Sequence, residues 1–157
     1  MCGIAGFIHF ERDNGRPEWA AIAHSMGEAL NHRGPDDKGE WACPSGALVH
    51  RRLAVIDPDR GRQPMTRSRE GRDYAIVYNG ELYNTGALRR DLASKGYAFE
   101  TSSDTEVLLA AYMEYGEEAV SYTHLLPYAM ENSLEALARP LMAEATPATS
   151  RTSLVVV

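Results

Sequence analysis

The stretch Met1-Cys2-Gly3-Ile4-Ala5-Gly6-Phe7 opens the chain and places a thiol directly before an apolar run that continues to Phe10. Positions 3–10 are mostly apolar, and the glycines at 3 and 6 suit close approach by another backbone, so a β-strand is expected there. Only the initiator Met precedes Cys2. Removal of that Met would leave one residue that carries both a thiol and a free α-amine.

Downstream of this strand, extended and helical patterns follow one another without strict βαβ alternation, which predicts an α+β fold. Helices are expected from Pro17 to Leu30, from 85 to 95 with Asn84 as N-cap, and from the capping box Ser103-Asp104-Thr105-Glu106 to Gly116. Strands are expected at 39–42, 47–56, 74–78 and 97–101. The charged segment 58–72 is expected to be a solvated loop, and a helix over 130–145 would be interrupted by Pro140.

Composition narrows the class of protein. The length of 157 residues and the hydrophobic content of 44% suit one main globular domain. The net charge of −6 argues against a nucleic-acid partner, because no basic excess neutralises phosphates. No apolar run is long enough to span a membrane and no secretory signal is apparent, so a cytoplasmic location is expected. The two cysteines, Cys2 and Cys43, are too few for a disulfide framework, and Cys43 is interpreted as structural.

Six segments, taken in order, carry a family resemblance. They are Met1–Phe7, His32–Asp36, His50–Asp57, Gly61–Met65, Tyr78–Asn84 and Thr101–Val107. The series closely resembles the class II glutamine amidotransferase domain, the N-terminal-nucleophile type, and is most similar to glutamine-hydrolysing asparagine synthetase. Transaminating synthases and phosphoribosyl amidotransferases share the Cys-Gly-Ile start and a His-Arg-Gly segment. The resemblance implies an αββα sandwich of antiparallel sheets, incomplete in this chain.

The resemblance also implies the catalytic groups. Cys2 is the expected nucleophile, which forms a glutamyl thioester as ammonia leaves, and its α-amine, with a pKa near 7.7 to 8, is the expected base. Asn79 and Gly80 match the oxyanion hole, one through a side-chain N–H and the other through a backbone N–H. Read from the residues alone, Asn79-Gly80 is also the typical pair of a type I′ hairpin turn.

Substrate-binding roles follow from the same resemblance. Arg52 matches the arginine that pairs with the α-carboxylate of glutamine, whereas the adjacent Arg51 is interpreted as a surface residue. Glu81 and Asp104 match acidic residues near the α-ammonium, although an acidic residue in a first helical turn is favoured by the helix dipole without any ligand. The remaining implied roles are backbone contacts to substrate from Val55 and Ile56 and a shaping role for His32, Arg33 and His50.

The resemblance covers residues 1–120, interpreted as a partial amidotransferase domain. Residues 121–157 do not continue the family pattern and are expected to be artefactual or poorly ordered, which would leave sheet edges uncovered and a marginally stable fragment. A synthetase domain is missing from the sequence, so ATP and Mg²⁺ are expected only there and this chain needs no cofactor or metal. The complete enzyme is a possible homodimer.

Candidate functions of two classes, enzyme and non-enzyme, are open. The chain is either the glutaminase part of an asparagine-synthetase-type enzyme that makes asparagine from aspartate with ATP, or an inactive truncated fragment or non-catalytic subunit. An amidotransferase with another ammonia acceptor is the third possibility. The isolated chain is expected to have weak activity or none.

Overall fold

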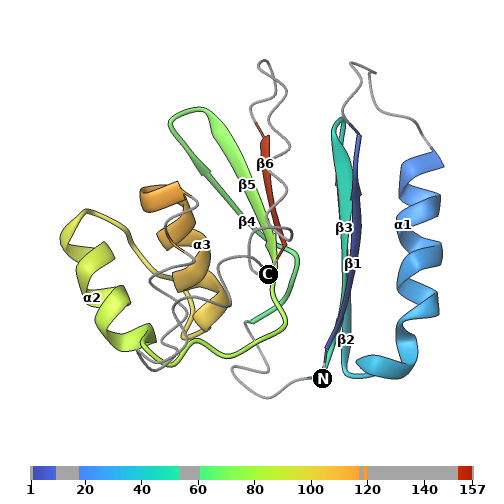
Figure 1. Ribbon diagram of the computed structural model, residues 1–157, viewed down its shortest axis with the longest axis horizontal. Helices are drawn as coiled ribbons and strands as arrows, with labels where there is room; N and C mark the ends of the chain where they lie inside the picture. The colour runs from blue at the N-terminus through green and yellow to red at the C-terminus, as the bar shows by residue number, and fades with distance from the viewer. Residues whose placement is uncertain (1, 10–17, 54–60, 117–118, 120–151, 157) are drawn as a thin grey trace, which may run out of the picture.

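The computed structural model describes residues 2–9, 18–53, 61–116, 119 and 152–156, and these form four layers in the order helix, sheet, sheet, helices (Figure 1). Helix α1 (Glu18–Ala29) covers the outer face of the first sheet, and α2 (Thr85–Ser94) and α3 (Asp104–Tyr115) lie on the other side of the second. This arrangement confirms the expected α+β sandwich, αββα in its layer order.

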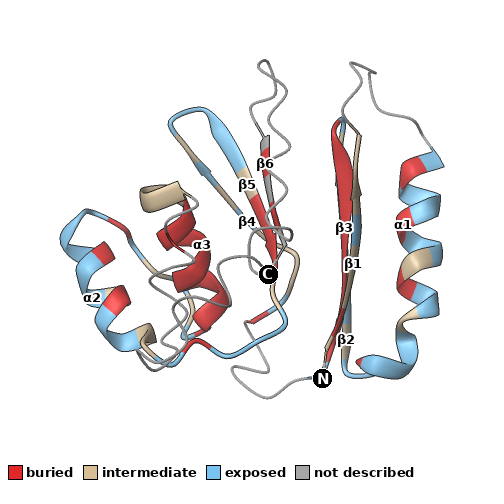
Figure 2. Ribbon diagram, viewed as in Figure 1, coloured by how far each residue is buried: buried red, intermediate tan, exposed pale blue. Residues whose placement is uncertain are grey.

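The first sheet has the strand order β1 (Gly3–Ile8), β3 (Gly46–Arg52), β2 (Asp37–Cys43), and both pairings are antiparallel. The central strand β3 is buried along its whole length (Figure 2). Because successive side chains of a strand point to opposite faces, Ala47 and Val49 pack with Ala23 of α1, whereas Leu48 packs toward the second sheet. A short 3-10 turn, η1 (Asn31–Arg33), links α1 to β2.

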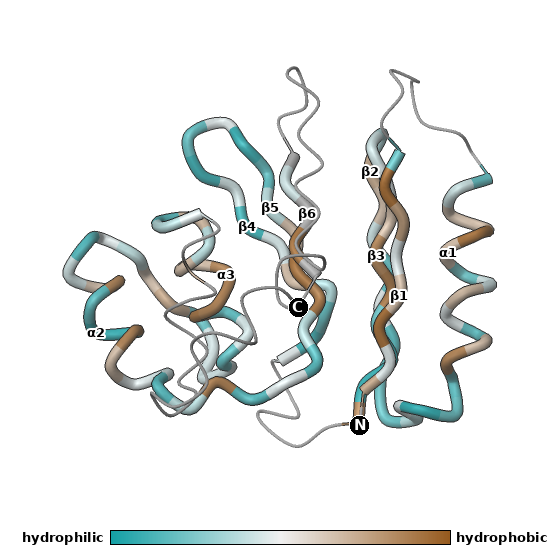
Figure 3. Tube along the Cα trace, in the orientation of Figure 1, coloured by the Kyte–Doolittle hydropathy of each residue, from teal (hydrophilic) through white to brown (hydrophobic). Residues whose placement is uncertain are grey.

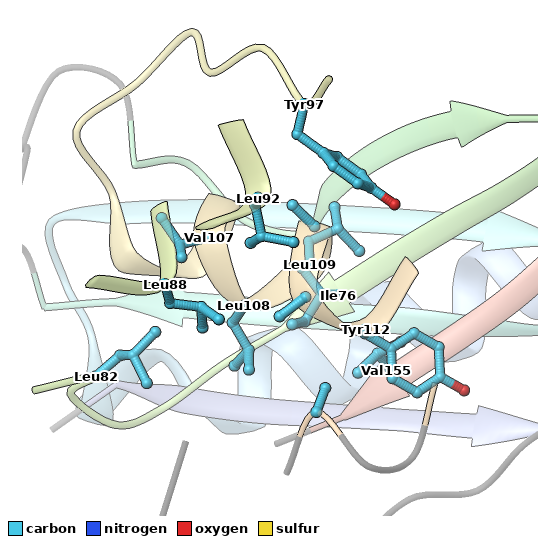
Figure 4. Close-up of a cluster of buried hydrophobic side chains, with 13 residues drawn as sticks. Ile76, Leu82, Leu88, Leu92, Tyr97, Val107, Leu108, Leu109, Tyr112 and Val155 are labelled. Atoms are coloured by element: carbon cyan, nitrogen blue, oxygen red, sulfur yellow. The ribbon is translucent and has the colours of Figure 1, made fainter. Parts of the chain in front are cut away.

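The second sheet has the order β4 (Met65–Arg69), β5 (Arg72–Val77), β6 (Thr152–Val156). Strands β4 and β5 pair antiparallel and share a hydrophilic hairpin tip, whereas β6 pairs parallel to β5 (Figure 3). The largest hydrophobic cluster lies between this sheet and the helices α2 and α3, with Ile76, Leu92 and Leu109 fully buried (Figure 4). Between the sheets, Ala75 and Val77 of β5 pack with Leu48, and the partly buried Ile4, Ile8, Trp41 and Cys43 pack against these three residues.

Several sequence predictions of secondary structure were wrong. Residues 65–69, expected within a solvated loop, form strand β4, and residues 97–101, expected as a strand, form no strand. In that segment the backbone N–H groups of Glu100 and Thr101 donate to the Glu106 carboxylate, at 2.9 and 2.8 Å. The backbone therefore uses a helix side chain instead of a neighbouring strand.

The predicted caps also differ from the observed ones. The Asn84 side chain makes no capping hydrogen bond to α2. The Ser103 hydroxyl caps α3 by accepting from the Thr105 N–H, and Glu106 turns away toward residues 100 and 101, so the reciprocal capping box does not form. The extended segment predicted at 47–56 ends at Arg52 as β3, and residues 54–60 and the helix predicted at 130–145 lie outside the described part of the chain.

None of the helices in the described part of the chain has the length and apolar character required to traverse a bilayer. Within the same residues, no three His, Cys, Asp or Glu side chains gather closely enough to hold a metal ion.

Candidate active site

One cavity, with a volume of about 350 Å³, brings together all the predicted site residues that the structure describes. Its lining includes Cys2, Arg52, Asn79, Gly80, Glu81 and Asp104. These residues come from the starts or ends of β1, β3, β5 and α3, so both sheets and the α3 layer meet at this point, whereas α1 contributes no lining residue. Val55 and Ile56, the other two predicted site residues, lie outside the described part of the chain.

Cys2 precedes β1 and is half-buried. Its Sγ accepts a hydrogen bond from the backbone N–H of Leu53 at 3.3 Å and lies 3.5 Å from the Leu53 carbonyl oxygen, to which the thiol can donate. This contact follows from the pairing of Gly3 with Arg51 between β1 and β3. This backbone N–H fixes the position of the sulfur relative to the end of β3.

Arg52 is the last residue of β3 and lines the cavity with only 5% of its surface exposed. The prediction that the adjacent Arg51 is a surface residue was wrong. Arg51 is 4% exposed and lies on the opposite face of β3, where its Nε donates to the Gly27 carbonyl at 2.8 Å. Its guanidinium also pairs with Glu28, and this hydrogen bond lowers the pKa of the Glu28 carboxyl. The two arginines therefore have separate environments, one in the cavity and one against α1.

Asn79 and Gly80 follow β5, but the hairpin turn that their sequence suggests does not form, because the next element is α2. A Cβ at Gly80 would lie 2.7 Å from the Tyr78 hydroxyl, so the ring of Tyr78 packs directly against this glycine. Burial, followed by the nearby Asp104 and Glu81 carboxylates, raises the pKa of Tyr78 to about 12. The phenol lining the cavity is therefore neutral at physiological pH.

Asp104 is the first residue of α3 and is 9% exposed. One carboxylate oxygen accepts from the Leu82 N–H at 3.2 Å, and the Thr105 hydroxyl lies 3.5 Å from the other. Glu81 lines the same cavity from an exposed position. Arg52 therefore supplies positive charge to the cavity, while Glu81 and Asp104 supply negative charge, an arrangement complementary to a zwitterion.

His50 is buried between the sheets, two residues before Arg52 on the same face of β3. Burial and the Arg52 charge lower its pKa to about 4, against smaller opposing effects of Asp37 and of a hydrogen bond to the Tyr78 backbone. His32 and Arg33 are exposed in η1 and do not line the cavity. The shaping role expected of all three residues stays a prediction.

Sequence reasoning assigned no role to Gln63, which also lines the cavity. Its Oε1 accepts from the Tyr78 N–H at 2.6 Å and its Nε2 donates to the Thr105 hydroxyl at 3.0 Å. Tyr78, Leu53 and Thr105 were likewise not singled out. Each acts through contacts between residues far apart in the chain, and the only signal in the sequence was their place within or beside the six motif segments.

Comparison with known proteins agrees with this geometry. Residues 1–125 match the family model described as a glutamine amidotransferase domain. The chain belongs to that family. Among curated relatives of this amidotransferase domain, glutamine-hydrolysing asparagine synthetase 3 of Bacillus subtilis (strain 168) is 43% identical over 122 residues, which are 78% of this chain and 20% of the relative.

Two further relatives give the same picture. Glutamine-hydrolysing asparagine synthetase B of Escherichia coli (strain K12) is 36% identical over 118 residues, 75% of this chain and 20% of that protein. Glutamine-hydrolysing asparagine synthetase 3 of Arabidopsis thaliana is 40% identical over 120 residues, 76% of this chain and 20% of that protein. The amidotransferase chain thus spans about a fifth of the length of these curated relatives.

Proposed function

We propose that this domain hydrolyses the side-chain amide of glutamine to glutamate and ammonia through a thioester on Cys2. The observation that carries the proposal is the meeting of a thiol, an arginine, two carboxylates and the Asn79-Gly80 pair in one cavity, within a chain of the glutamine amidotransferase family. A cavity of about 350 Å³ is at the small end of the range for ligand sites and suits one amino acid.

The charges around the cavity support glutamine as the substrate. The Arg52 guanidinium pairs with the α-carboxylate, and Asp104 and Glu81 face the α-ammonium, so both charges of the amino acid are matched. A simple amide would lack these charges and could not pair with the Arg52 guanidinium or with the two carboxylates, which disfavours its binding. The side-chain amide of glutamine then extends toward Cys2.

The reaction proceeds in two steps. With Met1 removed, the α-amine of Cys2 takes the thiol proton and the sulfur attacks the amide carbon, which forms a C–S bond and a tetrahedral oxyanion. Asn79 and Gly80 donate N–H groups to that oxyanion. Collapse breaks the C–N bond, the protonated amine gives its proton to the leaving nitrogen as ammonia forms, and water then hydrolyses the thioester to glutamate.

The longer protein of which such a domain is part would use the ammonia. By analogy with the relatives, a synthetase domain would combine it with aspartate to give asparagine, and ATP and Mg²⁺ would belong to that domain. We place this activity in the cytoplasm, in a homodimeric enzyme, with no nucleic-acid or membrane partner. An inactive fragment, a non-catalytic subunit or an amidotransferase with a different acceptor is the alternative, because the chain spans only about a fifth of its relatives.

The two cysteines provide the test and its matched control. We expect Cys2→Ala to abolish the production of glutamate and ammonia from glutamine by the 157-residue chain, and Cys43→Ala to leave it unchanged, because half-buried Cys43 lies at the other end of β2 from the site. A glutamine analogue with a diazoketone in place of the amide should add covalently to Cys2 alone. Intact-mass spectrometry also shows whether Met1 is removed.

The outcomes separate the candidate functions. Turnover that Cys2→Ala does not reduce would overturn the proposed mechanism. No turnover and no selective labelling by a chain that is folded and has lost Met1 would favour the inactive fragment.

A further inference from the structure

The segment 78–82, which carries Asn79 and Gly80, lies between β5 and α2 and belongs to no helix or strand. Its backbone is nevertheless attached at both ends. Gln63 accepts from the N–H of Tyr78 at 2.6 Å, and Asp104 accepts from the N–H of Leu82 at 3.2 Å. The position of the proposed oxyanion donors therefore depends on two side chains that come from outside the segment.

These two attachments are themselves connected. The Gln63 Nε2 donates to the Thr105 hydroxyl at 3.0 Å, and that hydroxyl lies 3.5 Å from the Asp104 carboxylate. Thr105 is 2% exposed, so this end of the connection is buried, whereas Gln63 is half-buried. A hydrogen-bonded path thus runs from the Tyr78 backbone through the Gln63 amide and the Thr105 hydroxyl toward Asp104.

Gln63 is also fixed from the side of the first sheet. A Cβ at Gly39 on β2 would lie 1.9 Å from the Gln63 carbonyl oxygen, so the backbone of Gln63 lies directly against the backbone of this strand. Both polar atoms of the Gln63 side chain are engaged with the protein. The residue therefore contacts the first sheet, the end of β5 and the start of α3 at the same time.

We propose that Gln63 is a positioning residue that holds the oxyanion-binding segment at a fixed distance from the start of α3, where Asp104 binds the substrate. The proposal rests on the proposed glutaminase function for its kinetic consequence. Gln63 acts through Tyr78 and Thr105 and not on the substrate. Because the oxyanion exists only after attack, an error in this distance reduces kcat more than it raises KM.

The first measurement does not depend on activity. Hydrogen exchange of the Tyr78 amide, followed by NMR, should be faster in Gln63→Met than in the unmodified chain, because Met has a similar length but accepts no comparable hydrogen bond. Amides in the middle of β3 report global stability in the same experiment. Equal exchange at Tyr78 in both proteins, or acceleration no larger than at β3, would overturn the proposal.

The second measurement tests the effect on catalysis. We expect Gln63→Met to lower kcat for glutamine by about 10-fold to 100-fold, with KM changed less than about threefold, as for a misplacement of reacting groups. The rate of Cys2 labelling by the diazoketone analogue should fall relative to the rate with iodoacetamide, which needs no oxyanion donors. A parallel loss of both labelling rates would show general unfolding and would refute the positioning role.

Thr105 provides the matched variants. Thr105→Val removes the hydroxyl and should reproduce part of the kcat loss. Thr105→Ser retains the hydroxyl and should keep most of the activity. Thr66→Val, on the exposed face of β4, is the control. Because Gln63 and Thr105 share one hydrogen bond, Gln63→Met combined with Thr105→Val should be little slower than Gln63→Met alone. Fully additive losses would contradict the hydrogen-bonded connection between Gln63 and Thr105.

An unmodified chain that lacks glutamine turnover, but whose Tyr78 amide is protected from exchange, would overturn the glutaminase function and leave the anchoring of the segment intact.

Discussion

The Leu82 N–H donates to the Asp104 carboxylate across 3.2 Å, which joins the end of the segment after β5 to the first turn of α3. Asp104 is buried there and faces the same cavity as Arg52. The carboxylate therefore has a structural partner in the backbone in addition to its proposed role in binding an ammonium group. These two roles can be separated, because an amide oxygen can also accept from Leu82.

Replacing Asp104 by Asn should separate them. Asp104→Asn retains an acceptor for Leu82 and removes the negative charge, so KM for glutamine should rise about 10-fold or more, as for a lost hydrogen bond to a charged group. The thermal midpoint should change little. Asp104→Ala should show the same KM effect and also a lower midpoint. Steady-state kinetics and thermal unfolding check both, and an unchanged KM in Asp104→Asn would remove Asp104 from the substrate site.

The neighbouring arginines should respond differently to the same substitution. Arg51→Met removes the hydrogen bond to the Gly27 carbonyl and the ion pair with Glu28, and should lower the free energy of unfolding by about 1 to 3 kcal/mol, with little effect on KM. Arg52→Met should raise KM with a smaller effect on stability. Denaturant unfolding and glutamine kinetics of the pair measure this contrast. The reverse pattern would mean that the two arginines had been assigned to the wrong faces of β3.

His50 should make the stability of the fold depend on pH. Burial and Arg52 lower its pKa to about 4 in the folded chain, whereas an unfolded histidine has a pKa near 6.5. Between these values the unfolded chain binds a proton that the folded chain does not, so the His50 contribution is complete above about pH 6.5 and is lost as pH falls toward 4. The loss amounts to roughly 3 kcal/mol.

Urea unfolding at several pH values between 7 and 4.5 measures this dependence. His50→Gln should be less stable at pH 7 but should show a flatter profile over that interval. The carboxylates, including Glu106, lose their contribution mainly below this interval: burial opposes ionisation of Glu106, but hydrogen bonds from residues 100 and 101 lower its pKa overall. An equally steep profile in His50→Gln would assign the dependence to other groups.

Gly39 should be intolerant of any side chain. Gly39→Ala would place its Cβ 1.9 Å from the Gln63 carbonyl oxygen, so either β2 or the backbone at Gln63 must move. We expect a loss of about 1 to 3 kcal/mol in unfolding free energy, as for overpacking, together with lower glutamine turnover. Gly86→Ala, in the first turn of α2 with only the tip of Arg90 within 4 Å, is the control and should be neutral or slightly stabilising. Equal stabilities of the two variants would contradict the close approach at Gly39.

The elements that sequence reasoning predicted well are those whose pattern is local. The helix α1 and the strands β1, β3 and β5 have apolar spacing that matches their secondary structure. Strand β4 was missed because Arg67 and Arg69 make it resemble a charged loop. Arg67 in fact donates to the Ala98 carbonyl and pairs with Glu106, and Arg69 lies over the Tyr97 ring at 4.1 Å. Such partners are far away in sequence and leave no periodic signal.

In the candidate site, too, local features could be predicted from the sequence and long-range contacts could not. Motif resemblance predicted the residues that meet in the cavity, because each lies in a short segment typical of the family. It could not predict how those segments are held together. The Gln63 amide connects residues 15 and 42 positions away in the chain, and Leu53 lies 51 positions from Cys2. These contacts arise from the packing of the layers, and no local pattern in the sequence indicates them.

The attacking sulfur and its proposed oxyanion donors belong to different sheets, with Cys2 at the start of β1 and Asn79 after β5. Ala75 is fully buried where the two sheets face each other, against Leu48. The size of this small residue therefore helps to set the thickness of the sandwich, and with it the gap that the carbonyl carbon must bridge. A bulkier side chain at position 75 would push the two sheets apart and so change the distance between Cys2 and Asn79, although residue 75 itself does not line the cavity.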